Sequence, residues 1–301
     1  MTIRIGVNPI AWSNDDKQEL GGHIPLETCL SEARQAGYAG IELGHKFPRD
    51  AATLRPILEA HDIDLVGGWY STQLLRRSVA DEIAAMRDHL QLLLDMNCSV
   101  FILAETSNAI HGDQSAGLSR SPLLTAAEMT AFCHDMSELC AYIHDQGLVT
   151  AYHHHMGTVI ETPAQIAAFM EQTSDRVGFL LDTGHATFGT GDPAALARTY
   201  ASRITHLHCK DIRRPVLDAK RKADSAFLDA VVDGVFTVPG DGSVDYPPVL
   251  DALKAANFAG WIVVEAEQDP DKANPLEYTS MGYRNLSKMI AEAGFTIQDK
   301  A

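Results

Sequence analysis

The amino-acid sequence predicts an α/β fold, a (β/α)₈ TIM barrel, with residues 1–301 forming a single domain. Short apolar or β-branched runs alternate with longer segments of helical periodicity along the whole chain. Eight strands, each followed by a helix, are the pattern that closes into a barrel. The alternative is a doubly wound open sheet, which usually carries a glycine-rich fingerprint after its first strand, and VNPIAWSNDD is not one.

The predicted strands are short runs rich in Val, Ile and Leu. In chain order they are Ile3–Val7, Gly40–Leu43, Leu65–Trp69, Val100–Ala104, Leu148–Tyr152, Val177–Leu181, Ile204–His208 and Trp261–Glu265. Apolar residues at helical spacing between them predict helices over Ile24–Gly37, Ile83–Met96 and Ala126–Gln146. Two further helices are expected to begin at Pro163 and Pro193, each after an N-cap residue.

Composition and charge limit the classes of function. The chain holds 40 acidic and 24 basic residues, a formal net charge of −16, which disfavours binding to nucleic acid. No apolar run reaches the roughly 18 residues that a membrane span needs, and the opening MTIRIGVNPIAW lacks the pattern of a signal peptide. The five cysteines show no CxxC spacing, so we expect buried, free thiols in a reducing cytoplasm.

Two connections are longer than simple turns. They are Glu105–Leu124 after the fourth strand and Ile212–Ser243 after the seventh. Connections of this length usually act as lids or have local structure of their own. Both leave the carboxyl ends of strands, which form the catalytic face of a barrel. Lys220–Lys222 in the second connection is interpreted as a solvated charge run.

Metal-ligand side chains follow four consecutive strands. The fifth strand leads into AYHHHMG, where His153 and His155 share a side because alternate residues of a strand do. Asp182 ends the sixth strand and His185 follows it, while His208 lies in the seventh strand. The eighth strand ends in VVEAE, with Glu265 and Glu267 on one side. Barrel closure brings these ends together, so the sequence predicts one divalent metal ion.

The mixture of imidazoles and carboxylates favours Mn²⁺ or Co²⁺, with Zn²⁺, Fe²⁺ or Mg²⁺ as alternatives. The absence of a cysteine pair argues against a structural zinc site. Other polar or aromatic side chains near the strand ends are candidates for binding a small polyol, whose C–H faces stack on rings and whose hydroxyls need hydrogen-bond partners. These candidates are Asn8, Trp12, Glu42, Trp69, Glu105, His155 and Asp211.

Several of these segments are familiar as motifs. They are GVNPIAWSNDD, GIELG followed by FP, AETSNAIHGDQ with LSRSP, YHHHMGTVIET, LLDTGHA and HLHCKD. Through them the sequence resembles the xylose-isomerase-like barrel superfamily of sugar isomerases and epimerases, and within it the inosose dehydratase (2-keto-myo-inositol dehydratase) family of inositol catabolism. The resemblance covers nearly the whole chain. The NPIAW and HGD segments are the most specific, because LDTGH and HxKD recur across the superfamily.

The resemblance implies that Asp182, His208 and Glu265 bind the metal, together with a ligand from the fifth strand. Related epimerases carry a glutamate there that is both ligand and base, whereas this chain offers His153 or His155. We expect His153 to be the ligand. The resemblance therefore implies dehydration, with Glu265 as the base that removes the proton α to the ketone. His153, His155, His185 or Lys210 is the candidate acid for the departing hydroxyl.

Three other functions are alternatives to this one. A metal-dependent isomerase or epimerase of a free ketose or inosose would use the same barrel and metal. An abasic-site endonuclease shares the fold but needs basic loops that face DNA, which a net charge of −16 disfavours. A non-enzymatic sugar-binding protein would not explain ligand residues on four strands. The exposed faces of barrel helices would allow a homo-oligomer, and the expected partner is a small neutral polyol or ketocyclitol.

Overall fold

Eight parallel strands form a closed barrel in the computed structural model, which describes residues 1–299. Neighbouring strands follow the order of the chain, and β1 closes the barrel by pairing with β10, from Ile3 opposite Gly260 to Val7 opposite Val264. The barrel strands are β1 (Thr2–Val7), β2 (Gly40–Leu43), β3 (Asp64–Thr72), β4 (Val100–Glu105), β5 (Val149–His153), β6 (Phe179–Asp182), β7 (Ile204–Cys209) and β10 (Gly260–Val264). The predicted barrel is confirmed.

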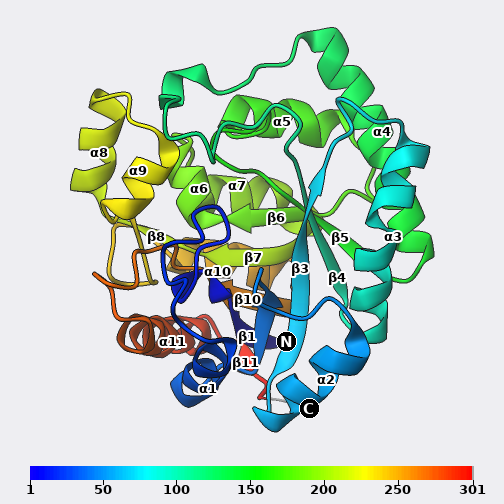
Figure 1. Cartoon of the computed structure of the whole chain (residues 1–301). Helices are drawn as coiled ribbons and strands as arrows, with labels where there is room; N and C mark the ends of the chain where they lie inside the picture. The colour runs from blue at the N-terminus through cyan, green and yellow to red at the C-terminus, as the bar shows by residue number, and fades with distance from the viewer. Residues whose placement is uncertain (300–301) are drawn as a thin grey trace.

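Helices surround the strands on the outside of the barrel (Figure 1). They are α1 (Leu26–Ala36), α2 (Ala51–Ala60), α3 (Val79–Asp95), α4 (Ala126–Asp145), α5 (Pro163–Gln172), α7 (Pro193–Tyr200), α10 (Pro247–Ala255) and α11 (Pro275–Glu292). Their apolar faces pack on the strands as one large buried cluster. The short strand β11 (Thr296–Ile297) adds a further pairing to β1.

The ends of some elements differ from the prediction. Helix α3 begins at Val79 rather than Ile83 because the Ser78 hydroxyl caps it by accepting from the amide of Asp81. Strand β3 runs past Trp69 to Thr72 because its last residues pair with the end of β4. Strands β5 and β6 each begin later than expected and end on His153 and Asp182.

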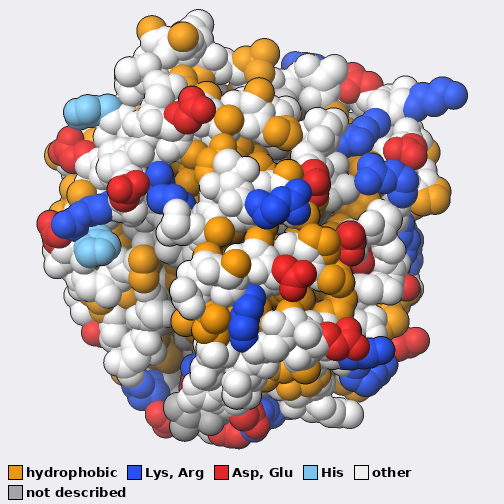
Figure 2. Space-filling model, turned by 180° about the vertical axis from the view of Figure 1, so that it is seen from behind, with side chains coloured by type: hydrophobic (Ala, Val, Ile, Leu, Met, Phe, Trp, Pro, Cys, Tyr) orange, Lys and Arg blue, Asp and Glu red, His pale blue; other side chains and the backbone are white. Residues whose placement is uncertain are grey.

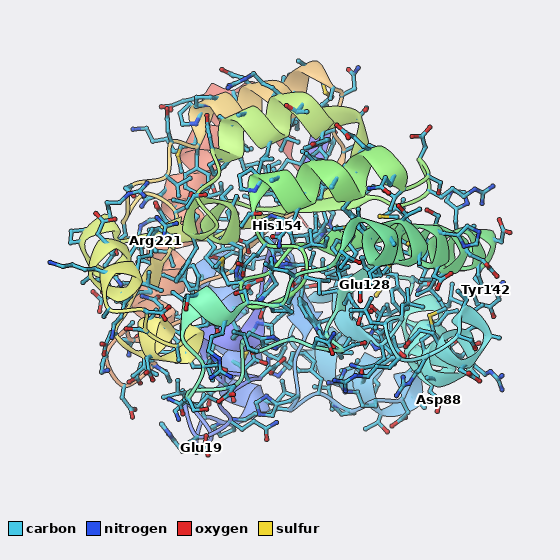
Figure 3. The ribbon with its side chains drawn as sticks, turned by 90° about the horizontal axis from the view of Figure 1, so that it is seen from above. Glu19, Asp88, Glu128, Tyr142, His154 and Arg221 are labelled. Atoms are coloured by element: carbon cyan, nitrogen blue, oxygen red, sulfur yellow. The ribbon has the colours of Figure 1, made fainter. Side chains whose placement is uncertain are left out.

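The long connection after β7 has structure of its own. It contains β8 (Asp211–Ile212), α8 (Arg214–Lys222), α9 (Phe227–Val232) and β9 (Phe236–Thr237). Their apolar residues form a separate buried cluster with Met156 and Phe188. The basic run at the end of α8 serves this packing: Arg221, labelled in Figure 3, bonds the carbonyl of Phe188, and Lys220 pairs with Asp233.

The surface and the cysteines agree with the composition. On the face shown in Figure 2, acidic and basic side chains are interspersed among apolar ones. Within residues 1–299, no helix is long and apolar enough to span a bilayer. The five cysteines are free thiols, and all of them are buried, as predicted.

Strands β5 and β6 approach closely at Gly178, so we predict that Gly178→Ala destabilises the barrel. A Cβ atom there would lie 2.0 Å from the carbonyl oxygen of Thr150, a backbone atom that cannot move aside alone. We expect a loss of about 1–3 kcal/mol in the free energy of unfolding, the usual range for overpacking. Thermal and denaturant unfolding would measure it.

Gly112→Ala is the matched control, because its Cβ would meet nothing within 4 Å and the residue is exposed. The stability of that variant should be unchanged or slightly raised. Equal stability of the two variants would contradict the packing argument.

Candidate metal centre

Four side chains from consecutive barrel strands converge at the carboxyl end of the barrel. His153 ends β5, Asp182 ends β6, His208 lies in β7 and Glu265 follows β10, and each offers one ligand atom within 4.8 Å of the others. The Asp182 Oδ2 atom lies 3.7 Å from His153 Nε2 and 3.6 Å from His208 Nδ1. The His208 Nδ1 atom lies 2.5 Å from Glu265 Oε2. All four residues are buried.

These four residues, the ligand cluster, fit a divalent metal ion. Asp182 Oδ2 is buried and has no hydrogen-bond partner within residues 1–299, and it faces His208 Nδ1 at 3.6 Å. An unpaired carboxylate oxygen in the interior is costly, and a cation between these atoms would satisfy both. Two imidazoles and two carboxylates are donors that borderline divalent ions accept.

Hydrogen bonds on the outer side orient the two imidazoles. His153 Nδ1 is 2.6 Å from the carbonyl oxygen of His154, to which it donates when protonated, so that Nε2 faces the cluster. His208 Nε2 lies 3.0 Å from Glu42 Oε1, which leaves Nδ1 toward the cluster. These outer partners fix the ring orientation and the tautomer of metal-binding histidines. Asp182 is held in turn, since its Oδ1 accepts from the amide of His185 at 2.7 Å.

Glu42 is an ionised carboxylate beneath the cluster. Its Oε1 accepts from His206 Nε2 at 2.8 Å as well as from His208, and its Oε2 accepts from Asn8 Nδ2 at 2.7 Å. Burial raises the pKa of Glu42, but the two imidazoles outweigh burial and bring it to about 2. Glu42 therefore orients His208, besides lining the cavity described below.

The three consecutive histidines have different surroundings. His155 lies outside the ligand cluster: its Nδ1 is 2.8 Å from the carbonyl oxygen of Met156, and its ring lies 3.9 Å from that of His185. His154 points the other way, since its Nε2 accepts from the amide of Asp182 at 3.3 Å. In Figure 3, seen from above, His154 lies near the middle of the molecule. The structure thus brings His153 to the cluster and leaves His155 on the cavity wall.

Lys210 is a fully buried cation beside the cluster. Its Nζ lies 2.6 Å from Glu265 Oε1, 3.3 Å from Glu267 Oε2 and 3.2 Å from His185 Nε2. Burial lowers the pKa of Lys210, but the two glutamates outweigh burial and hold it above its ordinary value. Burial, and then the neighbouring His155 and Lys210, hold the pKa of His185 well below its ordinary value. Neither Lys210 nor His185 is among the described residues that line the cavity.

Glu267 is the second carboxylate that Lys210 reaches. Its Oε1 accepts from Asn14 Nδ2 at 3.2 Å. Burial raises the pKa of Glu267 to about 7, although Lys210 opposes that rise.

A cavity of about 80 Å³ opens beside the ligand cluster. It is lined by Asn8, Ile10, Asp15, Asp16, Glu42, Leu43, Trp69, Ile102, His111, His153, His155, His208, Glu265 and Glu267. Four of the seven predicted substrate-binding residues lie on this wall, namely Asn8, Glu42, Trp69 and His155. The prediction missed Asp15, Asp16 and His111, although their loops were the two most specific motifs of the sequence.

Trp12 was predicted to bind substrate and does not line this cavity. Its side chain is buried in the main apolar cluster, and its Nε1 donates to Glu32 Oε2 at 2.6 Å. The indole lies in the 3₁₀ turn that follows β1, where its large apolar surface packs into the core rather than toward the cavity.

Glu105 and Asp211 were also predicted to bind substrate, and both instead hold the backbone. Glu105 accepts from the amides of Leu74 and Ser107, at 2.8 Å each, which shapes the loops after β3 and β4. Asp211 accepts from four amides, and in this way ties the start of the connection after β7 to a later part of it. These amides belong to Ile212, Gly240, Gly242 and Val244. A buried carboxylate needs such partners, and here the backbone supplies them.

The barrel and the ligand cluster together define a class of protein: an α/β barrel with a divalent-metal site at the carboxyl ends of its strands. The family described as "Xylose isomerase-like TIM barrel" matches residues 30–289. The chain belongs to this family.

Among curated relatives, the chain is 47% identical over 297 residues to "Rhizopine catabolism protein MocC" of Rhizobium meliloti, covering 99% of this chain and 91% of that protein. It is 40% identical to "Inosose dehydratase" of Geobacillus thermodenitrificans (strain NG80-2), covering 92% and 93% of the two chains. It is 38% identical to "Inosose dehydratase" of Clostridium tetani (strain Massachusetts / E88), covering 96% and 98%.

Solved structures share the fold at low sequence identity. An L-ribulose 3-epimerase superposes with a TM-score of 0.67 at 16% identity, covering 97% of this chain and 95% of that one. The IOLI protein, whose crystal structure has "a binding zinc atom", superposes with a TM-score of 0.68 at 15% identity, covering 97% and 99%. These similarities establish the architecture alone.

We predict that Asp182→Asn lowers divalent-metal affinity by more than about 100-fold, because it removes the charge of a direct ligand. Glu42→Gln should lower affinity by about 10–100-fold, the usual loss when an outer partner of a metal-binding histidine is changed. Calorimetric titration with Mn²⁺ and the metal content of dialysed protein would measure both effects.

Asp218→Asn is the matched control, since Asp218 is an exposed carboxylate on α8. It should bind Mn²⁺ as the wild-type protein does. If Asp182→Asn also bound Mn²⁺ with wild-type affinity, the ligand cluster would not be the metal site.

Proposed function

We propose that this protein is a metal-dependent inosose dehydratase, a hydro-lyase of inositol catabolism. It converts 2-keto-myo-inositol (scyllo-inosose) to a trihydroxycyclohexane-1,2-dione and water. The observation that carries this proposal is the ligand cluster of His153, Asp182, His208 and Glu265 on the wall of a small polar cavity. Relatives at 38–40% identity that bear the name inosose dehydratase support the substrate and the reaction.

The histidine at the end of β5 favours dehydration over epimerisation. The family resemblance implies that His153 stands where related epimerases carry a glutamate that acts as a base. Epimerisation needs a base on each face of the deprotonated carbon, whereas dehydration needs one base and one acid. With His153 in the cluster, Glu265 is the ligand carboxylate best suited to serve as the base.

A divalent ion at this site supplies Lewis-acid polarisation of the ketone oxygen, which makes the neighbouring C–H more acidic. The two imidazoles and two carboxylates favour Mn²⁺ or Co²⁺. Zn²⁺, Fe²⁺ and Mg²⁺ are alternatives.

Glu265 is the proposed base for the proton α to the ketone. It lines the cavity, and Lys210 Nζ lies 2.6 Å from its Oε1. Burial raises the pKa of Glu265, but His208 and Lys210 outweigh burial and hold it well below its ordinary value. Glu265 is therefore ionised, the form in which a carboxylate accepts a proton.

The cavity suits a neutral polyol. Asn8 and His155 offer hydrogen-bonding groups, and the indole of Trp69 offers a face for the C–H groups of a ring. The net charge of −16 disfavours anionic substrates and nucleic acid. We expect the protein to act in the cytoplasm without binding membranes, where its buried thiols stay reduced, and its helix faces allow a homo-oligomer.

A metal-dependent isomerase or epimerase of a free ketose or inosose is the second candidate. The observation in its favour is Glu267, a second carboxylate on the cavity wall that would provide the additional base. The likeness to an L-ribulose 3-epimerase concerns the fold alone.

One assay separates the two functions. The wild-type protein with Mn²⁺ or Co²⁺ and scyllo-inosose should form a product with the ultraviolet absorbance of a dione, measured together with proton exchange in D₂O. Exchange of the α proton without loss of water would contradict the dehydratase and favour the epimerase.

We further predict that Glu265→Gln lowers kcat for dehydration by about 10²–10⁴-fold, the range for loss of a general base. Metal content must be measured alongside, because Glu265 is also a ligand. Wild-type turnover by a metal-loaded Glu265→Gln protein would show that another group removes the proton.

A further inference from the structure

The dehydration requires an acid for the departing hydroxyl, and the residues expected to supply it are badly placed. Lys210 and His185 are buried beside Glu265 and Glu267, outside the set of described residues that line the cavity. His155 lines the cavity, but its Nδ1 donates to the carbonyl oxygen of Met156 at 2.8 Å and its ring packs 3.9 Å from that of His185. The Nδ1 proton of His155 is therefore already engaged by the backbone.

His111 and Asp16 form a pair on the cavity wall. His111 comes from the loop after β4, and Asp16 comes from the loop after β1, which is dark blue in Figure 1. The His111 Nε2 atom lies 3.6 Å from Asp16 Oδ1. The His111 ring lies 5.1 Å from that of His155, which in turn lies 5.5 Å from that of His153. The pair therefore stands one imidazole ring away from the ligand cluster.

The two loops are held in place by contacts with the barrel and with each other. The amide of Ile110 donates to the carbonyl of Gly157 at 2.8 Å, just after β5. A Cβ atom on Gly157, whose φ is +74°, would lie 2.8 Å from the amide nitrogen of His111, so glycine permits this close approach. Lys17 Nζ donates to Gln114 Oε1 at 2.9 Å and joins the two loops.

Asp16 is fixed from the cavity side. Its amide donates to Asn14 Oδ1 at 2.8 Å, and Asn14 Nδ2 donates to Glu267 at 3.2 Å. The loop that carries Asp16 is thus bonded to the same wall as Glu265 and Glu267. This arrangement presents the Asp16 carboxylate to His111 in a defined position.

The buried position of His111 does not serve the stability of the fold. Its Nδ1 is buried and has no hydrogen-bond partner among the described residues, which is unfavourable for folding. Burial lowers the pKa of His111, but Asp16 outweighs burial and raises it above the ordinary value. The carboxylate therefore favours the protonated imidazole, with Nε2 as the nitrogen beside Asp16.

We infer that His111 is the catalytic acid that protonates the departing hydroxyl, with Asp16 as its positioning residue. This inference rests on the proposed dehydration. Glu267 is the competing acid on the wall, but its two oxygens already accept from Asn14 and approach Lys210 Nζ. Among the described residues, His111 Nε2 has Asp16 as its one ion-pair partner.

Glu265 takes the proton from the carbon α to the ketone, and the C–H electron pair forms the enediolate. That electron pair then forms a C=C bond as the adjacent β C–O bond breaks, and the departing oxygen takes a proton from the imidazolium of His111. Water leaves, the remaining enol tautomerises to the dione, and solvent returns a proton to His111 as Glu265 loses one.

His111→Gln tests the inference with two substrates and a second readout. With scyllo-inosose, we expect kcat for loss of water to fall by about 10²–10⁴-fold. Exchange of the α proton with D₂O, which needs only the base, should stay within a few-fold of wild type, as should metal content. With an analogue that carries fluorine in place of the departing hydroxyl, fluoride leaves without an acid, so turnover should return close to the wild-type rate.

Asp16→Asn should show a smaller loss of the same kind, with the same recovery on the fluorinated analogue. His61→Gln is the matched control, because His61 pairs with Glu27 on the outer surface at 3.0 Å. It should behave as the wild-type protein does. These three variants separate an acid from a residue that merely maintains the fold.

Several outcomes would overturn the inference. Undiminished loss of water in His111→Gln would do so, as would an equal fall in exchange and elimination, or a decoupling of exchange from elimination in Glu267→Gln instead. If the wild-type protein itself removes no water from scyllo-inosose, the proposed function fails, and the role of His111 with it. Loss of water by the wild type together with any of the first three outcomes refutes the acid role alone.

Discussion

The structure depends on how buried negative charge is balanced at the carboxyl end of the barrel. Four carboxylates are buried near one another in this region, and isolated charges there would be very unfavourable for folding. They belong to Glu42, Asp182, Glu265 and Glu267. Lys210 lies between Glu265 and Glu267. The His208 imidazole lies close to Glu42, Asp182 and Glu265. Asp182 Oδ2, which has no hydrogen-bond partner among the described residues, faces His208 Nδ1 across the space that suits a divalent cation.

This balance divides the polar residues into two roles. Groups whose lone pairs are filled by the protein, such as Glu105 and Asp211, hold loops in place. Groups that keep an atom toward the cavity, such as Glu265 and His111, are available for chemistry. Position along the chain does not separate these two roles, because each of the four residues lies near the end of an apolar strand or in the loop after one.

The barrel also explains how distant loops share one site. Parallel strands place all their carboxyl ends on one face, so the loops after β1 and β4 meet above the ligand cluster. Gly157 allows the second of these loops to lie against the turn after β5. A catalytic pair drawn from residues 16 and 111 is therefore a consequence of strand order, and not of any local pattern in either segment.

The sequence by itself determined the barrel, because periodicity of apolar residues and the number of strands are local properties that add up along the chain. The residue types at successive strand ends also predicted a metal site, since these ends converge whenever a barrel closes, and the family resemblance singled out Asp182, His208 and Glu265 among them. The different surroundings of His153 and His155 came from the tertiary structure, because His155 lies two residues beyond the end of β5, where the regular alternation of a strand no longer holds. The tertiary structure also shows that Trp12 packs in the core and that Asp16 lies beside His111. Neither could be predicted, since hydrogen-bond partners and loop contacts arise between residues far apart in sequence.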